Sequence, residues 1–207
     1  SGKTNQWQII SGMDATEREY MLYLPLYDGI HSLQIGVAAP SHIGQPSLPY
    51  PDTRKPIVFY GSSITQGACA SRPGMAATNL IGRKLNVETI NLGFSGNAFI
   101  DYEVAEMMAH VDASAYVLDY VPNASPEQIL EKTEKFVRIL REKHPDVPLI
   151  FVENPIFPHS KFDLRMAKEI KDKNDAMNQA FSSLKKQGLK KIYLVKGRSL
   201  ISANGES

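Results

Sequence analysis

Cysteine, net charge and long apolar runs are all scarce in this chain of 207 residues. Its single cysteine, Cys69, excludes an internal disulfide and any metal site built from several cysteines. The formal net charge is +1, and basic and acidic residues are mixed along the chain, so there is no basic stripe to suggest nucleic acid. No apolar run approaches the roughly 20 residues of a membrane span. We therefore expect a globular protein with no nucleic-acid partner and no membrane span; the sequence leaves its compartment and oligomeric state open.

The first 53 residues differ in character from the rest, and we assign them to an N-terminal segment of their own. In residues 17–37, "EREYMLYLPLYDGIHSLQIGV", side chains alternate with a period of two, which indicates strands. The Tyr27-Asp28-Gly29 stretch is a turn signal and predicts a hairpin. A stretch rich in Pro, Ser and Gly then leads to residue 56. The sequence thus predicts a short β-rich segment and a linker in residues 1–53.

The sequence pattern of residues 54–207 predicts an α/β protein with a five-stranded parallel sheet. Short apolar runs alternate with helical patterns along this part of the chain. The predicted strands are 57–60, 87–92, 115–120, 149–152 and 192–195, and the predicted helices are 74–85, 102–108, 126–142 and 163–186. In open α/β sheets, ligands bind at the carboxyl ends of the strands. Functional residues are therefore expected directly after strands.

Serine, glycine and asparagine follow the first three predicted strands. The first strand ends in "FYGSSITQG", which contains Ser62 and Ser63. This stretch alone fits a cap and turn, a phosphate cradle or a nucleophile, although the phosphate-binding pattern Gly-x-x-x-x-Gly-Lys-Ser/Thr is absent. Gly96 follows the second strand and Asn123 the third. A glycine N–H and an asparagine amide are neutral donors that suit an oxyanion, which favours the nucleophile.

At these three positions the chain resembles the SGNH (GDSL-type) hydrolase family of esterases and lipases. The matching blocks are "GSSI" at 61–64, "NLGFSG" at 91–96 and "YVPN" at 120–123. The resemblance implies a three-layer α/β/α, flavodoxin-like fold with Ser63 as nucleophile and Gly96 and Asn123 in the oxyanion hole. It also implies that residues 1–53 belong to the β-rich accessory domain of some bacterial members, and it is compatible with a secreted or periplasmic location. No metal or organic cofactor is implied.

Departures from the family pattern occur at both ends of this region. Ser62 stands where the family has aspartate, and Pro122 stiffens the loop before Asn123. The family's Asp-x-x-His block, which supplies the general base, should follow the fifth strand. The last twelve residues, "KGRSLISANGES", contain no such block. We expect residues 54–207 to lack this block and the base to lie beyond Ser207.

Other polar residues near the same edge are candidates for substrate contacts. Asp119 and Glu153 end the third and fourth strands, His159 follows the fourth, and Arg72 follows the nucleophile turn. The ordinary interpretation of His159 is an exposed loop residue, and that of Arg72 is a member of a surface ion pair. Cys69 is expected to be a small buried residue rather than a nucleophile, since no base is near it in sequence.

We therefore predict a carboxylic ester hydrolase that deacetylates a carbohydrate or another small acyl ester through Ser63. The alternative is a non-catalytic protein that binds a carbohydrate or an acyl group and keeps the site as a pocket. A weaker alternative is a flavodoxin-like binder of nucleotide or phosphate that uses the turn at 62–65.

Overall fold

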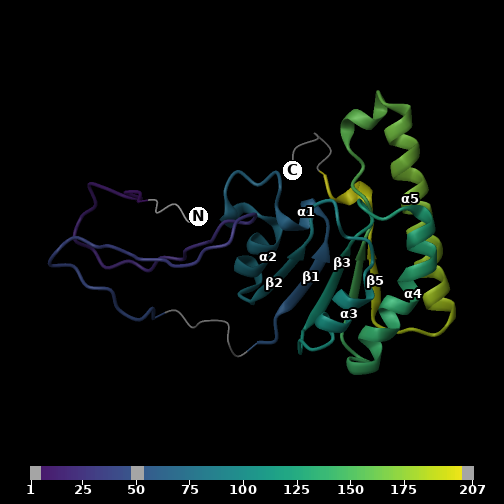
Figure 1. The fold of residues 1–207 in the computed structure, drawn as a ribbon, viewed down its shortest axis with the longest axis horizontal. Coiled ribbons are helices and arrows are strands. Elements are labelled where there is room, and N and C mark those ends of the chain that lie inside the picture. Colours follow the sequence, from purple (N-terminus) through teal and green to yellow (C-terminus); the bar gives the residue numbers. More distant parts are fainter. Residues whose placement is uncertain (1–5, 48–53, 202–207) are drawn as a thin grey trace.

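A computed structural model describes residues 6–47 and 54–201 of the protein (Figure 1). Its centre is a sheet of five parallel strands in the order β2-β1-β3-β4-β5. The strands are β1 (Ile57–Gly61), β2 (Thr89–Gly93), β3 (Ala115–Asp119), β4 (Leu149–Val152) and β5 (Ile192–Val195). Gly61, the last residue of β1, lies opposite Gly93 of β2 and Asp119 of β3. The carboxyl ends of these three strands therefore meet at one edge.

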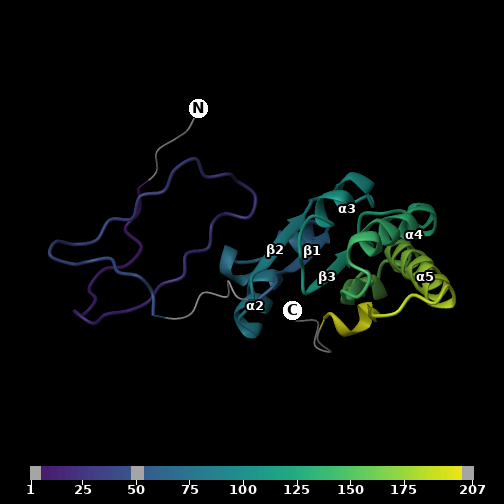
Figure 2. The same cartoon turned by 90° about the horizontal axis from the view of Figure 1, so that it is seen from below.

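Helices cover the two faces of the sheet unequally. The helices α3 (Tyr102–Met108), α4 (Pro126–Lys143) and α5 (Leu164–Lys186) share one core with the strands, and α4 packs along α5 (Figures 1 and 2). Right-handed crossovers place α2 (Ala77–Leu85) on the other face, against β2. On the first face Val58, Tyr116 and Leu118 are fully buried. On the second, Tyr193 of β5 is 55% exposed.

The predicted α/β/α arrangement is confirmed, and most element boundaries agree with the sequence patterns. The strands differ from their predicted ranges by two residues at most. Helix α4 begins after Ser125, whose side chain and that of Gln128 form a reciprocal capping box. The expected helix over 74–85 is split into a 3₁₀ turn, η2 (Pro73–Met75), and α2. One short helix was not expected, α1 (Ser63–Gln66), directly after β1.

The predicted hairpin in the N-terminal segment is wrong for the residues that the structure describes. Residues 6–47 contain neither helix nor strand, and the segment extends away from the sheet beyond α2 (Figures 1 and 2). Tyr20 and Ile35, both in the alternating pattern, are 65% and 64% exposed. A two-stranded hairpin is marginal in water unless further strands or a helix cover its apolar face. The alternation is present, but no strand of the described residues pairs with it and most of its side chains are exposed.

Two residues of that segment do contact the α/β unit. The side chain of Leu26 lies against Gly67, and Tyr23 lies against Gly74. The guanidinium of Arg83 in α2 sits 5.1 Å from the centre of the Tyr23 ring. The N-terminal segment is thus fixed beside the turn that follows β1.

Candidate active site

The two serines after β1 have different environments. Ser62 is fully buried and is the N-cap of α1, where its hydroxyl accepts a hydrogen bond from the Ile64 N–H at 3.2 Å. Ser63 is half-buried, and its hydroxyl makes no hydrogen bond to any residue that the structure describes. The hydroxyl of Ser62 is therefore engaged in capping, whereas that of Ser63 has no partner in the described residues.

Glycines allow the turn that follows β1 to pack directly on its neighbours. A Cβ added to Gly61 would lie 2.7 Å from the backbone oxygen of Asp119, and one added to Gly93 would lie 2.3 Å from the backbone nitrogen of Gln66. The Phe94 N–H also donates to the Gly61 carbonyl at 2.7 Å. Any side chain at these two positions would push α1 away from β2 and β3.

Side chains of α1 and β2 hold the loop that carries Gly96. The amide of Asn91 donates to the Thr65 carbonyl at 2.9 Å and accepts from the Gly93 N–H at 2.9 Å. The oxygen of the Gln66 amide accepts from the Ser95 N–H at 2.9 Å. Gly96 itself is exposed and has a φ of +69°, in the left-handed region that favours glycine. The Gly96 loop is therefore tied to the helix that begins with Ser63.

The loop after β3 positions the amide of Asn123. Its Oδ1 accepts from the Ala98 N–H at 3.3 Å, which links this loop to the loop after β2. Its backbone N–H donates to the Tyr120 carbonyl at 3.0 Å. Since Oδ1 is the acceptor, the Nδ2 group is left as a donor, and it makes no hydrogen bond within the described residues. The edge formed by β2, β1 and β3 thus carries Gly96, Ser63 and Asn123.

Asp119 lies beneath the turn that contains Ser62 and Ser63. It is 9% exposed, and its Oδ2 accepts from the Thr65 hydroxyl at 2.6 Å. Its backbone carbonyl accepts from the Ser62 N–H at 3.2 Å. Burial raises the pKa of Asp119 to about 7, although the hydrogen bond from Thr65 opposes this rise. Asp119 therefore supports α1, and its predicted contact with substrate stays a prediction.

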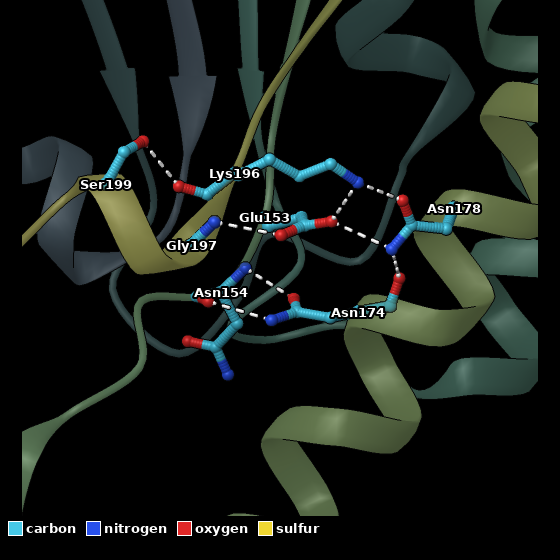
Figure 3. Close-up of polar contacts among 7 residues, drawn as sticks. All are labelled: Glu153, Asn154, Asn174, Asn178, Lys196, Gly197 and Ser199. Atoms are coloured by element: carbon cyan, nitrogen blue, oxygen red, sulfur yellow. Dashed lines mark hydrogen bonds and ion pairs between the residues drawn. The ribbon is translucent and has the colours of Figure 1, made fainter.

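Glu153 stands at the centre of a polar cluster at the end of β4 (Figure 3). It is 5% exposed, and its Oε1 accepts from the amide of Asn178 at 2.8 Å and from the ammonium of Lys196 at 3.0 Å. Its Oε2 accepts from the Gly197 N–H at 2.8 Å. These bonds join the ends of β4 and β5 to α5. With these bonds Glu153 is a structural anchor, and its predicted contact with substrate also stays a prediction.

Asn154 and Asn174 complete the cluster (Figure 3). The amide of Asn174, in α5, accepts from the Asn154 N–H at 2.8 Å and donates to the Asn154 carbonyl at 3.0 Å. A Cβ on Gly197 would lie 2.1 Å from that carbonyl, so only glycine fits there. A cavity of about 420 Å³ beside the cluster is lined in part by Ile156 and Arg198. It lies at β4 and β5, separated from Ser63 by β3.

The remaining predicted residues lie on the surface. His159 is exposed, and its ring stacks on Phe157 with the ring centres 5.6 Å apart. Arg72 is exposed, and its guanidinium donates to the Ser71 hydroxyl at 3.4 Å. Cys69 is also exposed, which corrects the expectation of a buried side chain: it lies in the surface turn after α1. Sequence reasoning overlooked Thr65 and Gln66, although both lie in the segment "SSITQG".

Neither a metal site nor a membrane helix is found in the described residues. In residues 6–47 and 54–201 there is no group of three or more His, Cys, Asp or Glu that could hold a metal ion. In the same residues no helix is long and apolar enough to cross a membrane.

Comparisons with known proteins agree with this fold. The family described as "GDSL-like Lipase/Acylhydrolase family" matches residues 54–207, and the "N-terminus of Esterase_SGNH_hydro-type" matches residues 1–43. A crystal structure from Bacteroides ovatus, assigned as a GDSL-like lipase, is 42% identical with a TM-score of 0.82. That match covers 89% of this chain and 54% of the other, so the chain spans about half the length of this relative. No curated protein matches the chain.

Two more distant structures share the fold. The salicylyl-acyltransferase SsfX3 from a tetracycline biosynthetic pathway is 19% identical, with a TM-score of 0.62 over 70% of this chain and 43% of that one. A carbohydrate acetylesterase family member from Sinorhizobium meliloti is 16% identical, with a TM-score of 0.52 over 73% of this chain and 87% of that one. At these identities the likeness concerns the fold alone.

Proposed function

Because this chain belongs to the GDSL-like lipase/acylhydrolase family, we propose that it is a serine ester hydrolase with Ser63 as the nucleophile. One observation carries the proposal. At the edge formed by β2, β1 and β3, an unbonded serine hydroxyl shares its surroundings with two loops that offer neutral donors. The substrate class we propose is an acetyl ester of a carbohydrate or another small acyl ester.

In this proposal the Ser63 Oγ attacks the ester carbonyl carbon, and the carbonyl oxygen becomes an oxyanion. The backbone N–H groups of Ser63 and Gly96 and the Nδ2 group of Asn123 donate hydrogen bonds to it. Collapse of the tetrahedral intermediate breaks the bond to the alcohol, and water then releases the acid from the acyl-enzyme. In the first step a general base takes the proton from Ser63 and returns it to the leaving alcohol, and in the second it takes a proton from water and returns it to Ser63. His159 is exposed and stacked on Phe157, and the Ser63 hydroxyl makes no hydrogen bond to it.

The experiment compares Ser63→Ala with Ser62→Ala in the whole gene product, using a small aryl acetate as substrate. Ser63→Ala should reduce kcat by at least about 10⁴-fold, as loss of a serine nucleophile does in related chemistry. Ser62→Ala removes a helix cap, which costs about 1 kcal/mol of stability and leaves the nucleophile in place. A fluorophosphonate probe should add its phosphonyl group to Ser63 in the wild type and in Ser62→Ala.

Full hydrolysis by Ser63→Ala would show that another residue attacks the ester. Saturable binding of an acetylated sugar by the wild type, with no turnover and no labelling of Ser63, would instead support the non-catalytic alternative.

A further inference from the structure

Lys173 is unusual among the lysines of α5 because its side chain is buried. Its side chain is 10% exposed, whereas that of Lys171, two residues earlier, is 72% exposed. A lysine ammonium is almost never buried without partners. Here it has two: the Glu169 carboxylate at 2.8 Å and the Pro122 carbonyl at 2.9 Å. The ammonium of Lys173 thus connects α5 to the loop that follows β3.

The Pro122 carbonyl belongs to the peptide unit that begins Asn123. A peptide unit is planar, so its C=O and N–H edges cannot rotate independently. Lys173 holds the C=O edge, and the Tyr120 carbonyl accepts from the N–H edge at 3.0 Å. The plane is therefore held on both sides immediately before the Asn123 Cα. Rotation of this plane would swing the Asn123 side chain, whose Oδ1 also accepts from the Ala98 N–H.

We propose that Lys173 is a positioning residue for the oxyanion hole: its bond to the Pro122 carbonyl fixes the direction in which Asn123 presents its Nδ2 group. The inference rests on the proposed function, in which Asn123 stabilises the oxyanion. Lys173 lies behind the loop and touches no reacting atom. Its effect should therefore appear in kcat rather than in substrate binding.

The first test compares Lys173→Met with Lys171→Met in the whole gene product. Lys173→Met keeps the apolar stem and removes the donor, so kcat should fall about 10- to 100-fold while KM changes less than about twofold. Lys171→Met breaks an exposed ion pair with Asp175 on the same helix and should leave kcat unchanged. Lys173→Arg retains a charged donor and should restore most of kcat. Rates are to be divided by the number of sites that fluorophosphonate labels, which removes any effect of misfolded protein.

A double-mutant cycle with Asn123→Ala tests the route of the effect. If Lys173 acts through Asn123, Lys173→Met should cause no further loss of kcat once Asn123 is alanine. Independent, multiplicative losses would overturn the inference, as would an unchanged kcat in Lys173→Met alone. If Lys173→Met does not fold, Lys173→Gln takes its place in the same cycle. Failure of the proposed function is seen separately, as hydrolysis that survives Ser63→Ala.

Discussion

The carboxyl ends of the strands form two regions, one at β2, β1 and β3 and the other at β4 and β5. Both carry similar polar residues, but they differ in how many of their polar side-chain atoms form hydrogen bonds. At β1, β2 and β3, the Ser63 hydroxyl and the Asn123 Nδ2 group bond to nothing in the described chain. At β4 and β5, both carboxylate oxygens of Glu153 and both polar atoms of the Asn174 amide bond to neighbours. Unused donors at a solvent-accessible edge are available to a ligand, whereas a satisfied buried cluster rigidifies the fold.

The contrast explains why residue type and strand position are insufficient to identify a site. Asn123 and Asn154 both follow strands at the same edge, and both lie next to a proline. The amide nitrogens of both make no hydrogen bond within the described residues, but only Asn123 has its amide oxygen fixed by a backbone donor. We expect substitutions at the first end to reduce catalysis and those at the second to reduce stability.

The largest effect is expected from Asn123. Removing one donor of an oxyanion hole costs about 100- to 1,000-fold in kcat, so Asn123→Ala should lose activity to that extent. Asn123→Asp keeps the oxygen that accepts from the Ala98 N–H but has no Nδ2 donor, and it should lose at least as much. Steady-state kinetics on an aryl acetate measure both. An active Asn123→Asp enzyme would show that the amide nitrogen has no part in catalysis.

A smaller effect, on stability alone, is expected at Asn174. Asn174→Ala leaves the N–H and C=O groups of Asn154 buried without partners, which should lower the free energy of unfolding by about 2–4 kcal/mol. Activity per folded molecule should remain near that of the wild type. Gln179→Ala, at an exposed position of the same helix, is the matched control and should change the free energy by less than about 0.5 kcal/mol. Urea unfolding measures both variants. A stable but inactive Asn174→Ala enzyme would erase the distinction between the two ends.

The effect of pH on stability is the smallest of the three when it is counted per pH unit. The pKa of Asp119 is raised from 3.8 to about 7, so between these pH values the folded protein holds a proton that the unfolded chain has released. Stability should therefore fall as pH rises through this window, by at most about 1.4 kcal/mol per pH unit, and level off above it. Asp119→Asn should remove this part of the slope, as measured by urea unfolding at a series of pH values.

Thr65→Val sharpens the same measurement. It removes the hydrogen bond that lowers the pKa of Asp119, so the fall in stability should continue to higher pH than in the wild type. Parallel curves for the wild type and Asp119→Asn would show that Asp119 does not titrate in this range.

Much of the fold could be predicted because the five strands are short apolar runs separated by helical patterns. Such runs report burial in a parallel sheet directly. The four residues of α1 were missed because they are too few to show a helical period. The hairpin over 17–37 was wrong because alternation shows which side chains suit burial, whereas a strand also needs a partner.

The three residues proposed for the centre of the site follow strands, so the sequence pattern could single them out. The residues that hold these three in position, such as Lys173, could not be identified in this way. Lys173 lies in the charged stretch "KEIKDKND", which has the composition of a solvent-exposed helix face. Its partner, Pro122, is 51 residues away in the chain. Only the fold, which brings α5 beside the loop after β3, shows that this lysine points inward.

The Gln66 amide connects the N-terminal segment to the loop that carries Gly96. Its Nε2 donates to the Leu26 carbonyl at 3.1 Å while its Oε1 holds the Ser95 N–H, next to Gly96. The Gln66 side chain thus bonds both to the N-terminal segment and to the loop that carries Gly96. A variant in which the N-terminal segment is shortened or replaced by that of a relative should therefore keep residues 23–26. Without these residues the Gln66 amide loses its bond to the Leu26 carbonyl and can rotate. A change in the N-terminal segment would then alter the loop that carries Gly96, which lies beside Ser63.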